Sequence, residues 1–192
     1  MHFDYIDLEP SNSGEKYVLM QRDDNSDYKT FFCLPNTDAE NAAHAIIDWC
    51  AANGVPGGLM SDASTHFKNE TVRLVSKGLK TPHHFTLPYC PWSNGAVERL
   101  GRELLRFLRS LISELQMDHK EWPDLIPIVQ SVLSNSVSPH RGNFCPITAF
   151  MGRDPTPPFL TFLRSSTATP VTVTEAQRES VLNVKTVVYL CA

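Results

Sequence analysis

Long apolar runs are missing from this sequence. None approaches the roughly 20 residues of a membrane-spanning helix, and residues 1–10 lack the basic-then-apolar order of a signal peptide. Paired cysteine motifs are missing too, because the five cysteines form no CxxC pair and are scattered over positions 33, 50, 90, 145 and 191. The pattern argues against a membrane protein, a disulfide framework and a zinc knuckle, and it predicts reduced thiols in an intracellular protein.

A dominant charge of one sign is also missing. The 192 residues include 17 Lys and Arg and 21 Asp and Glu, which gives a net charge of −4, and 42% of the residues are apolar. This composition excludes disorder as the main state and fits one domain of ordinary size with a sizeable core. Taken as a whole, the mild acidity argues against a nucleic-acid partner.

The charge is distributed unevenly along the chain. Residues 1–61 hold three basic and ten acidic side chains, whereas residues 62–110 hold eight basic and four acidic ones. A basic segment of this kind is typical of a binding face, and an accidental imbalance on a solvated surface is the alternative. Only a motif within the basic segment decides between the two.

Hydrophobic periodicity and turn residues predict a mixed α/β chain in the order β-β-β-α-β-α-β-α-α. The predicted strands cover residues 2–8, 16–21, 28–34, 57–62 and 83–87. The predicted helices cover residues 37–53, 67–77, 96–115 and 122–133. The first helix is expected to open with a capping box from Thr37 to Glu40 and to end at Gly54, and residues 88–95 are expected to form a loop.

Three carboxylates stand where they can converge on one point. Asp4 lies in the first predicted strand, Asp62 ends the fourth, and Glu98 lies in the first turn of the long helix. Carboxylate oxygens suit hard cations such as Mg²⁺ or Mn²⁺, and such a cluster can hold two ions roughly 3.5–4 Å apart for phosphodiester chemistry. Taken singly, each acid is explained as a surface Asp or as a helix-N-terminal Glu favoured by the macrodipole. The prediction of a metal site depends on the three together.

The combination resembles the catalytic core of retroviral and gypsy-type LTR-retrotransposon integrases. Asp4 lies in HFDYI, Asp62 opens DASTHFKN, and Glu98 lies in PYCPWSNGAVERLGREL. The 35 residues between Asp62 and Glu98 match the spacing of that family's Asp-Asp-35-Glu signature. A second block is similar to the family's region downstream of the core, at Trp122-Pro123, Asn135, Pro146, Ala149-Phe150 and Gly152-Arg153. The resemblance covers residues 2 to about 158.

This resemblance implies an RNase H-like fold, in which helices flank a five-stranded mixed sheet whose first three strands are antiparallel. It implies cleavage of element ends by water and then attack of the freed 3′-hydroxyl on target DNA, without a covalent enzyme intermediate. Two Mg²⁺ or Mn²⁺ ions are implied, with Asp4 bridging both while Asp62 and Glu98 each complete one. The implied partners are DNA (element ends and target) and further copies of the chain on that DNA, and the implied place of action is the nucleus.

Four arginines of the long helix share one face. Arg99, Arg102, Arg106 and Arg109 follow one another at spacings of three, four and three residues. At 100° per residue, Arg102 and Arg109 fall within about 40° of Glu98. Guanidinium groups in such a row suit phosphate contacts with DNA. The alternative is a solubilising face with i,i+4 pairs to neighbouring glutamates.

The segment before Glu98 resembles the mobile loop beside integrase active sites. Tyr89, Trp92 and Asn94 are predicted to contact DNA there, with Gly95 as a hinge, and a packed Pro-rich loop is the alternative. The histidines at positions 66, 83 and 84 lack a matching Cys/His spacing for a metal site. They are therefore predicted to be surface or core residues.

The sequence predicts an integrase-core-like domain with a C-terminal helical extension over residues 1–158, and a tail or truncated further module over residues 159–192. The main rival is a catalytically inactive, degenerate or host-adopted RNase H-like domain that binds nucleic acid or a partner. Another RNase H-like nuclease or DDE transposase and a purely structural α/β domain are the remaining alternatives.

Overall fold

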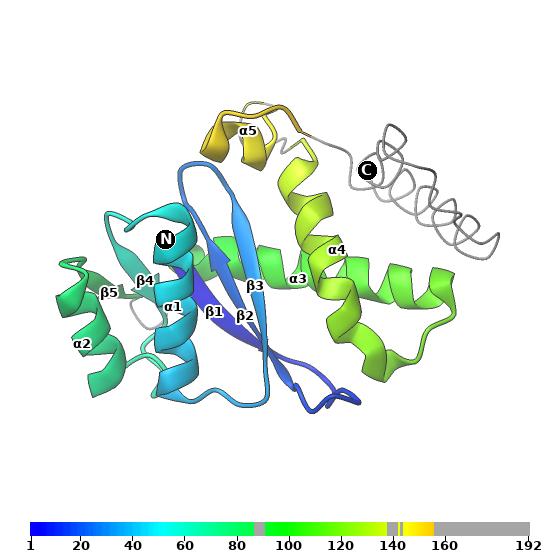
Figure 1. Cartoon of the computed structure of the whole chain (residues 1–192), viewed down its shortest axis with the longest axis horizontal. Coiled ribbons are helices and arrows are strands. Elements are labelled where there is room, and N and C mark those ends of the chain that lie inside the picture. Colours follow the sequence, from blue (N-terminus) through cyan, green and yellow to red (C-terminus); the bar gives the residue numbers. More distant parts are fainter. Residues whose placement is uncertain (87–90, 138–141, 143, 156–192) are drawn as a thin grey trace, which may run out of the picture. The chain divides into compact units, whose positions relative to one another are not determined.

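Five strands form one mixed sheet in the order β3-β2-β1-β4-β5 (Figure 1). They are β1 (His2–Asp7), β2 (Tyr17–Arg22), β3 (Lys29–Leu34), β4 (Leu59–Ser61) and β5 (His83–Phe85). The first three are antiparallel neighbours, whereas β4 runs parallel to β1 and β5 runs parallel to β4. The structure is a computed structural model that describes residues 1–86, 91–137, 142 and 144–155, with residues 91–94 by their backbone alone. The predicted five-stranded mixed sheet is confirmed.

The described helices are α1 (Ala39–Asn53), α2 (Glu70–Gly78), α3 (Pro91–Leu115), the short 3₁₀ helix η1 (His119–Glu121), α4 (Trp122–Asn135) and α5 (Pro146–Met151). Four of them correspond to predicted helices, and η1 and α5 were not predicted. None of these helices in the described part of the chain is long and apolar enough to cross a bilayer.

The predicted capping box of α1 is wrong. The helix starts after Asp38, which makes no side-chain cap hydrogen bond. The Asn36 side-chain oxygen instead accepts the Asp38 N–H at 3.3 Å and a hydrogen bond from the Asn41 side chain. An Asn two residues before the N-cap therefore organises the start of the helix. The predicted end is confirmed, because Gly54 adopts φ of 87° and donates its N–H to the Cys50 carbonyl at 2.9 Å.

The prediction of a loop over residues 88–95 is wrong from residue 91 onward. Helix α3 begins at Pro91, five residues before the predicted start, so Trp92, Asn94 and Gly95 lie within its first turns. Proline fits the first turn of a helix because the missing N–H has no intrahelical acceptor there. Gly and Asn lower helix propensity, but here the helix continues through both.

The face of the sheet that carries Asp4 and Ile6 is packed against α3. Alternate residues of a strand point to the same face, and Met20 lies directly across from Asp4 on β2. A Cβ built on Gly101 of α3 would lie 3.5 Å from Met20 Cε and 3.6 Å from Ile6 Cδ1. Glycine at this position therefore lets the helix backbone approach β1 and β2 closely. Figure 1 shows α1 in front of the sheet and α3 behind it.

The opposite face carries Phe3 and Tyr5 and holds an aromatic cluster. Phe67, which precedes α2, stacks on Tyr5 with a centroid separation of 5.2 Å and meets Phe3 edge-on at 4.8 Å. The prediction that α2 starts at Phe67 is wrong, because the helix starts at Glu70 and the Asn69 side chain caps it by accepting the Val72 N–H at 2.9 Å. Phe67 therefore lies outside the helix and anchors the segment after Asp62 to β1.

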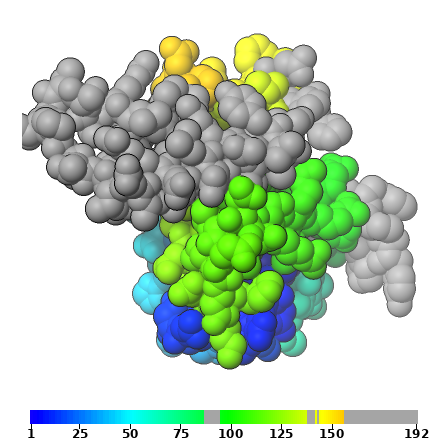
Figure 2. Space-filling view, turned by 90° about the vertical axis from the view of Figure 1, so that its right-hand side faces the viewer, coloured from blue at the N-terminus to red at the C-terminus, as the bar shows by residue number. Residues whose placement is uncertain are grey.

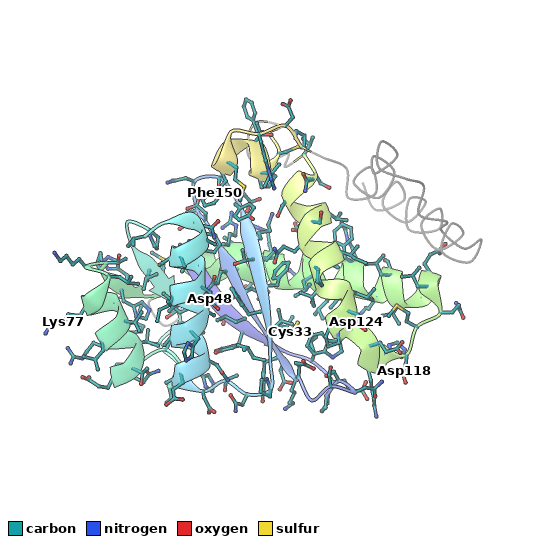
Figure 3. All side chains as sticks on the ribbon, in the orientation of Figure 1. Cys33, Asp48, Lys77, Asp118, Asp124 and Phe150 are labelled. Atoms are coloured by element: carbon teal, nitrogen blue, oxygen red, sulfur yellow. The ribbon has the colours of Figure 1, made fainter. Side chains whose placement is uncertain are left out.

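The chain divides into two compact units. The first contains residues 1–24 and 29–103, and the second contains residues 25–28 and the chain from residue 104 onward. Within the second unit α4 packs against η1 and α5, and Tyr28 stacks on Phe150 with a centroid separation of 4.5 Å and nearly parallel rings; Phe150 is labelled in Figure 3. The predicted tail over residues 159–192 lies outside the described residues, so it stays a prediction.

Candidate active site

Asp4 occupies the middle of β1 and is partly exposed. One of its carboxylate oxygens, Oδ1, accepts the backbone N–H of Tyr5 at 2.8 Å. Its neighbour Tyr5 points to the other face, where burial, followed by the negative charge of Asp38, raises the pKa of the phenol to about 12. Tyr5 therefore stays protonated at neutral pH. Because Tyr5 lies on the other face, Asp4 is the ionisable group that the middle of β1 presents on the α3 side.

Asp62 follows the last residue of β4 directly and is also partly exposed. Its Oδ1 accepts the backbone N–H of Ser64 at 3.2 Å. This hydrogen bond closes a tight turn of the Asx type, in which an aspartate side chain caps the backbone two residues ahead. The Ala63-Ser64 sequence thus supports an ordered turn after Asp62.

The strand register brings Asp4 and Asp62 to neighbouring positions. His2 of β1 pairs with Met60 of β4, and the Met60 N–H donates to the Met1 carbonyl at 2.9 Å. Two residues beyond this pair lie Asp4 and Asp62, and neighbouring strands are roughly 4.8 Å apart. Side chains alternate between the two faces along a strand, and each aspartate is two residues beyond a member of the His2–Met60 pair. Continuation of both strands would therefore put the two side chains on the same face. The sequence prediction that these two acids lie side by side is consistent with this register.

Glu98 lies on the exposed side of α3. Gly101, one turn further along, is the residue at which this helix touches Ile6 and Met20 on the Asp4 face of the sheet. Within the described part of the chain, no three His, Cys, Asp or Glu side chains are grouped closely enough to hold a metal ion. Continuation of the β1–β4 register would thus align Asp4 with Asp62, whereas no described three-ligand group includes Glu98.

The residues present fit a hard divalent cation. Two partly exposed carboxylates on neighbouring strands offer oxygen ligands, and Mg²⁺ binds through one or two carboxylates while it keeps several waters. A third carboxylate carried by the helix on the same face can complete such a ligand set. Asp4 and Asp62 are consequently the two main candidate ligands of the ion.

Helix α3 is amphipathic, as expected for a helix predicted from hydrophobic periodicity. The apolar stripe is buried at Val97, Leu100, Leu104, Leu108 and Leu111. All four arginines of the row, Arg99, Arg102, Arg106 and Arg109, are exposed. The first two lie in the first unit and the last two in the second. In Figure 2 the green atoms belong to α3 and to the segment that follows it, and part of them lies at the surface in this view.

Three further predicted DNA contacts are not tested by the geometry. Tyr89 lies outside the described residues, and Trp92 and Asn94 are described by their helical backbone alone. Of the histidines considered in the sequence, His66 and His84 are exposed and His83 is half-buried.

Sequence reasoning missed a contact between Ser61 and His83. The Ser61 Oγ lies 2.9 Å from Nε2 of His83, and the Ser61 hydroxyl donates to the Asp62 carbonyl at 2.9 Å. Both residues lie in predicted strands, but the sequence does not show that these two strands are neighbours. Nothing in the sequence alone therefore joined positions 61 and 83.

Comparison with solved structures decides the fold. The chain superposes on the catalytic core domain of bovine immunodeficiency virus (BIV) integrase with a TM-score of 0.64 at 18% identity, over 79% of this chain and 92% of that one. It also superposes on a chain of the simian T-cell lymphotropic virus intasome in complex with the PP2A regulatory subunit B56 gamma, with a TM-score of 0.68 at 14% identity, over 78% of this chain and 52% of that one. The chain has the fold of an integrase catalytic core.

Sequence relatives agree with this integrase core fold. The Pro-Pol polyprotein of simian foamy virus type 3 (strain LK3) is 30% identical over 158 residues, 81% of this chain and 13% of that protein. The Pol polyprotein of transposon 412 from Drosophila melanogaster is 25% identical over 147 residues, 76% of this chain and 12% of that protein. No family model matches the chain. The resemblance to integrase cores of retroviruses and retrotransposons is thus confirmed, while the chain spans about an eighth of these polyproteins.

Proposed function

We propose that this chain is the catalytic core of a retroelement integrase, which processes the 3′ ends of element DNA and joins them to target DNA. The observation that carries the proposal is the parallel β1–β4 register, whose continuation past the His2–Met60 pair would align Asp4 with Asp62. Helix α3, which carries Glu98, packs against the same face of β1 near Gly101. The same fold in a BIV integrase core supports it.

In this proposal each carboxylate has a role that its position supports. Asp4 and Asp62 would hold the divalent ions beside the reacting phosphodiester. Glu98, carried by α3, would supply a third carboxylate ligand. Bound divalent ions would activate the attacking water or 3′-hydroxyl and stabilise the charge on the leaving oxygen. The neighbouring Arg102 contacts a phosphate close to the reacting one.

The proposed partners follow from the same surface. DNA ends and target DNA are the substrates, and further copies of the chain assemble on that DNA, as the intasome of the simian T-cell lymphotropic virus relative suggests. Because the target is chromosomal DNA, the proposed place of action is the nucleus.

The joining assay tests this function. Purified protein, supplied with labelled DNA that carries the terminal sequence of the parent element, should join it to a target duplex in Mn²⁺ or Mg²⁺. Removing the metal with a chelator should abolish joining, and added Mn²⁺ should restore it, because the carboxylates alone activate no nucleophile. Joining that continues at full rate in the chelator would contradict the two-metal proposal.

A second candidate function is a catalytically inactive domain that binds nucleic acid or a partner. The observation that favours it is the lack of a ready three-ligand group in the described residues. This alternative expects DNA binding without joining under every metal condition, and binding that is unchanged by Glu98→Gln. The joining assay therefore separates the two candidates.

The arginine row makes a prediction of its own. Replacing Arg102 and Arg109 with Ala should weaken DNA binding at all sequences and lower the slope of log K against log salt by about two, roughly one for each phosphate left without its guanidinium. The measurement is DNA affinity by fluorescence anisotropy over a range of salt concentrations. Arg73→Ala on α2 is the matched control, because that exposed guanidinium already pairs with Glu70 at 2.5 Å. An equal slope in the double variant and the parent would reject the arginine row as a DNA-binding surface.

A further inference from the structure

Ser61 connects the metal-binding edge of the sheet to β5. It is the last residue of β4 and is 1% exposed, so its hydroxyl has no access to solvent. That hydroxyl has one hydrogen, and the Asp62 carbonyl at 2.9 Å can only accept it. With its hydrogen placed there, the Ser61 oxygen must accept from any further partner.

The further partner is His83. Its Nε2 lies 2.9 Å from the Ser61 oxygen, so Nε2 must carry the hydrogen and donate it. The imidazole ring is held by two aromatic neighbours, Phe3 at a centroid separation of 5.5 Å and Phe85 at 4.4 Å. Burial, followed by the charge of His84, lowers the pKa of His83. A neutral ring with its hydrogen on Nε2 is the state that this environment favours.

Asp62 lies just beyond the end of β4, so no hydrogen bond of the β4–β5 ladder fixes it. The β4–β5 ladder ends at the Ser61–Phe85 pair, and the Thr86 N–H donates to the Ser61 carbonyl at 2.8 Å. Asp62 is the next residue, and two hydrogen bonds orient it, from the Ser61 hydroxyl to its carbonyl and from the Ser64 N–H to its carboxylate. The first fixes its peptide plane and the second fixes its side chain.

We propose that Ser61 and His83 are positioning residues, which hold Asp62 in its metal-binding orientation through a hydrogen-bond relay from His83 Nε2–H to Ser61 Oγ and from Ser61 O–H to the Asp62 carbonyl. The inference rests on the proposed function, because it assigns a role to Asp62 as a metal ligand. Partners that orient metal ligands typically contribute 10–100-fold to metal affinity or activity.

The first test concerns the relay itself and needs no metal. Nitrogen-15 NMR of the imidazole of the whole chain should find His83 neutral, with its hydrogen on Nε2, at pH 7.5. A His83 ring with its hydrogen on Nδ1 alone would overturn the relay, since Nε2 would then have nothing to donate.

The second test measures Mn²⁺ binding to the DNA-free protein by electron paramagnetic resonance. Ser61→Ala and His83→Phe should each weaken Mn²⁺ affinity roughly 10- to 100-fold. Ser61→Thr keeps the hydroxyl and His83→Gln keeps an N–H donor, so both should stay closer to the parent. His84→Gln changes the exposed neighbouring histidine and should leave the affinity unchanged.

Two comparisons make the outcome decisive. If Asp62→Asn binds Mn²⁺ as tightly as the parent, the proposed metal site fails and the relay with it. If Asp62→Asn loses the ion while Ser61→Ala and His83→Phe keep parental affinity, the relay alone is wrong. Should Ser61→Ala fail to fold by circular dichroism, the contrast between His83→Phe and His83→Gln decides in the same way.

Discussion

Replacing Asp62 with Asn should lower the rate of DNA joining by at least roughly a thousandfold while the protein stays folded. A metal ion that stabilises transition-state charge is worth several kcal/mol, and about 4 kcal/mol corresponds to three factors of ten in rate. The amide keeps the size of the side chain and its hydrogen bond to the Ser64 N–H, so the turn after β4 is preserved. What disappears is one anionic ligand of the pair formed with Asp4.

The measurement is the single-turnover rate of joining in Mn²⁺, with circular dichroism to confirm the fold. Asp4→Asn and Glu98→Gln should behave like Asp62→Asn, because all three are proposed ligands of the same ions. Asp7→Asn on the same strand as Asp4 is the matched control, since that exposed carboxylate pairs with Lys16 at 3.3 Å. A rate for Asp62→Asn within about tenfold of the parent would remove this residue from the proposed site.

Replacing Phe67 with Ala should lower the free energy of unfolding by about 3–5 kcal/mol, a large part of the stability of a domain of this size. Phe67 is 1% exposed and lies against the rings of both Phe3 and Tyr5. Truncation leaves a cavity between β1 and the segment that follows Asp62. Because the same ring ties that segment to the sheet, joining activity should fall along with stability.

The measurement is urea unfolding monitored by far-ultraviolet circular dichroism. The m value, the slope of the unfolding free energy against urea concentration, should be the same in variant and parent. Phe67→Leu refills part of the space and should cost clearly less than Phe67→Ala. Phe144→Ala is the control for removal of a ring at the surface, since Phe144 is 62% exposed, and it should change stability by no more than about 0.5 kcal/mol. Equal stability of Phe67→Ala and Phe144→Ala would contradict the assigned role of the aromatic cluster.

The strands and the buried stripe of α3 were predictable because they depend on local periodicity. Strand-like runs over residues 16–21 and 28–34, bounded by turn residues, placed β2 and β3 within one residue of their observed bounds. The spacing of Val97, Leu100 and Leu104 identified the buried face of the long helix. The start of α3 was not predictable in the same way, since a Pro-Trp-Ser-Asn-Gly segment has the composition of a loop and becomes helical only as the first turns of a long helix.

The site was predictable in part for a related reason. The family pattern pointed to Asp4, Asp62 and Glu98 by residue type and spacing. Both features can be read from the sequence without knowledge of the side-chain conformations. The direction in which Glu98 points depends on its own rotamer at an exposed helix position, which no sequence pattern specifies. The contact between Ser61 and His83 depends on how β4 aligns with β5. These parallel strands are separated in the sequence by α2, so their alignment depends on tertiary packing and not on local sequence.

The parallel pairing of β1 with β4 also determines when in folding the site arises. Strands β1, β2 and β3 follow one another in the sequence and pair with their sequence neighbours, so they are able to assemble from comparatively local contacts. The neighbouring positions of Asp4 and Asp62 require a contact between residues 4 and 62, and contacts of such sequence separation pay a larger loop-closure entropy and form later. In a newly made chain the proposed pair of acids would therefore come into register only after the second half of the sheet had closed.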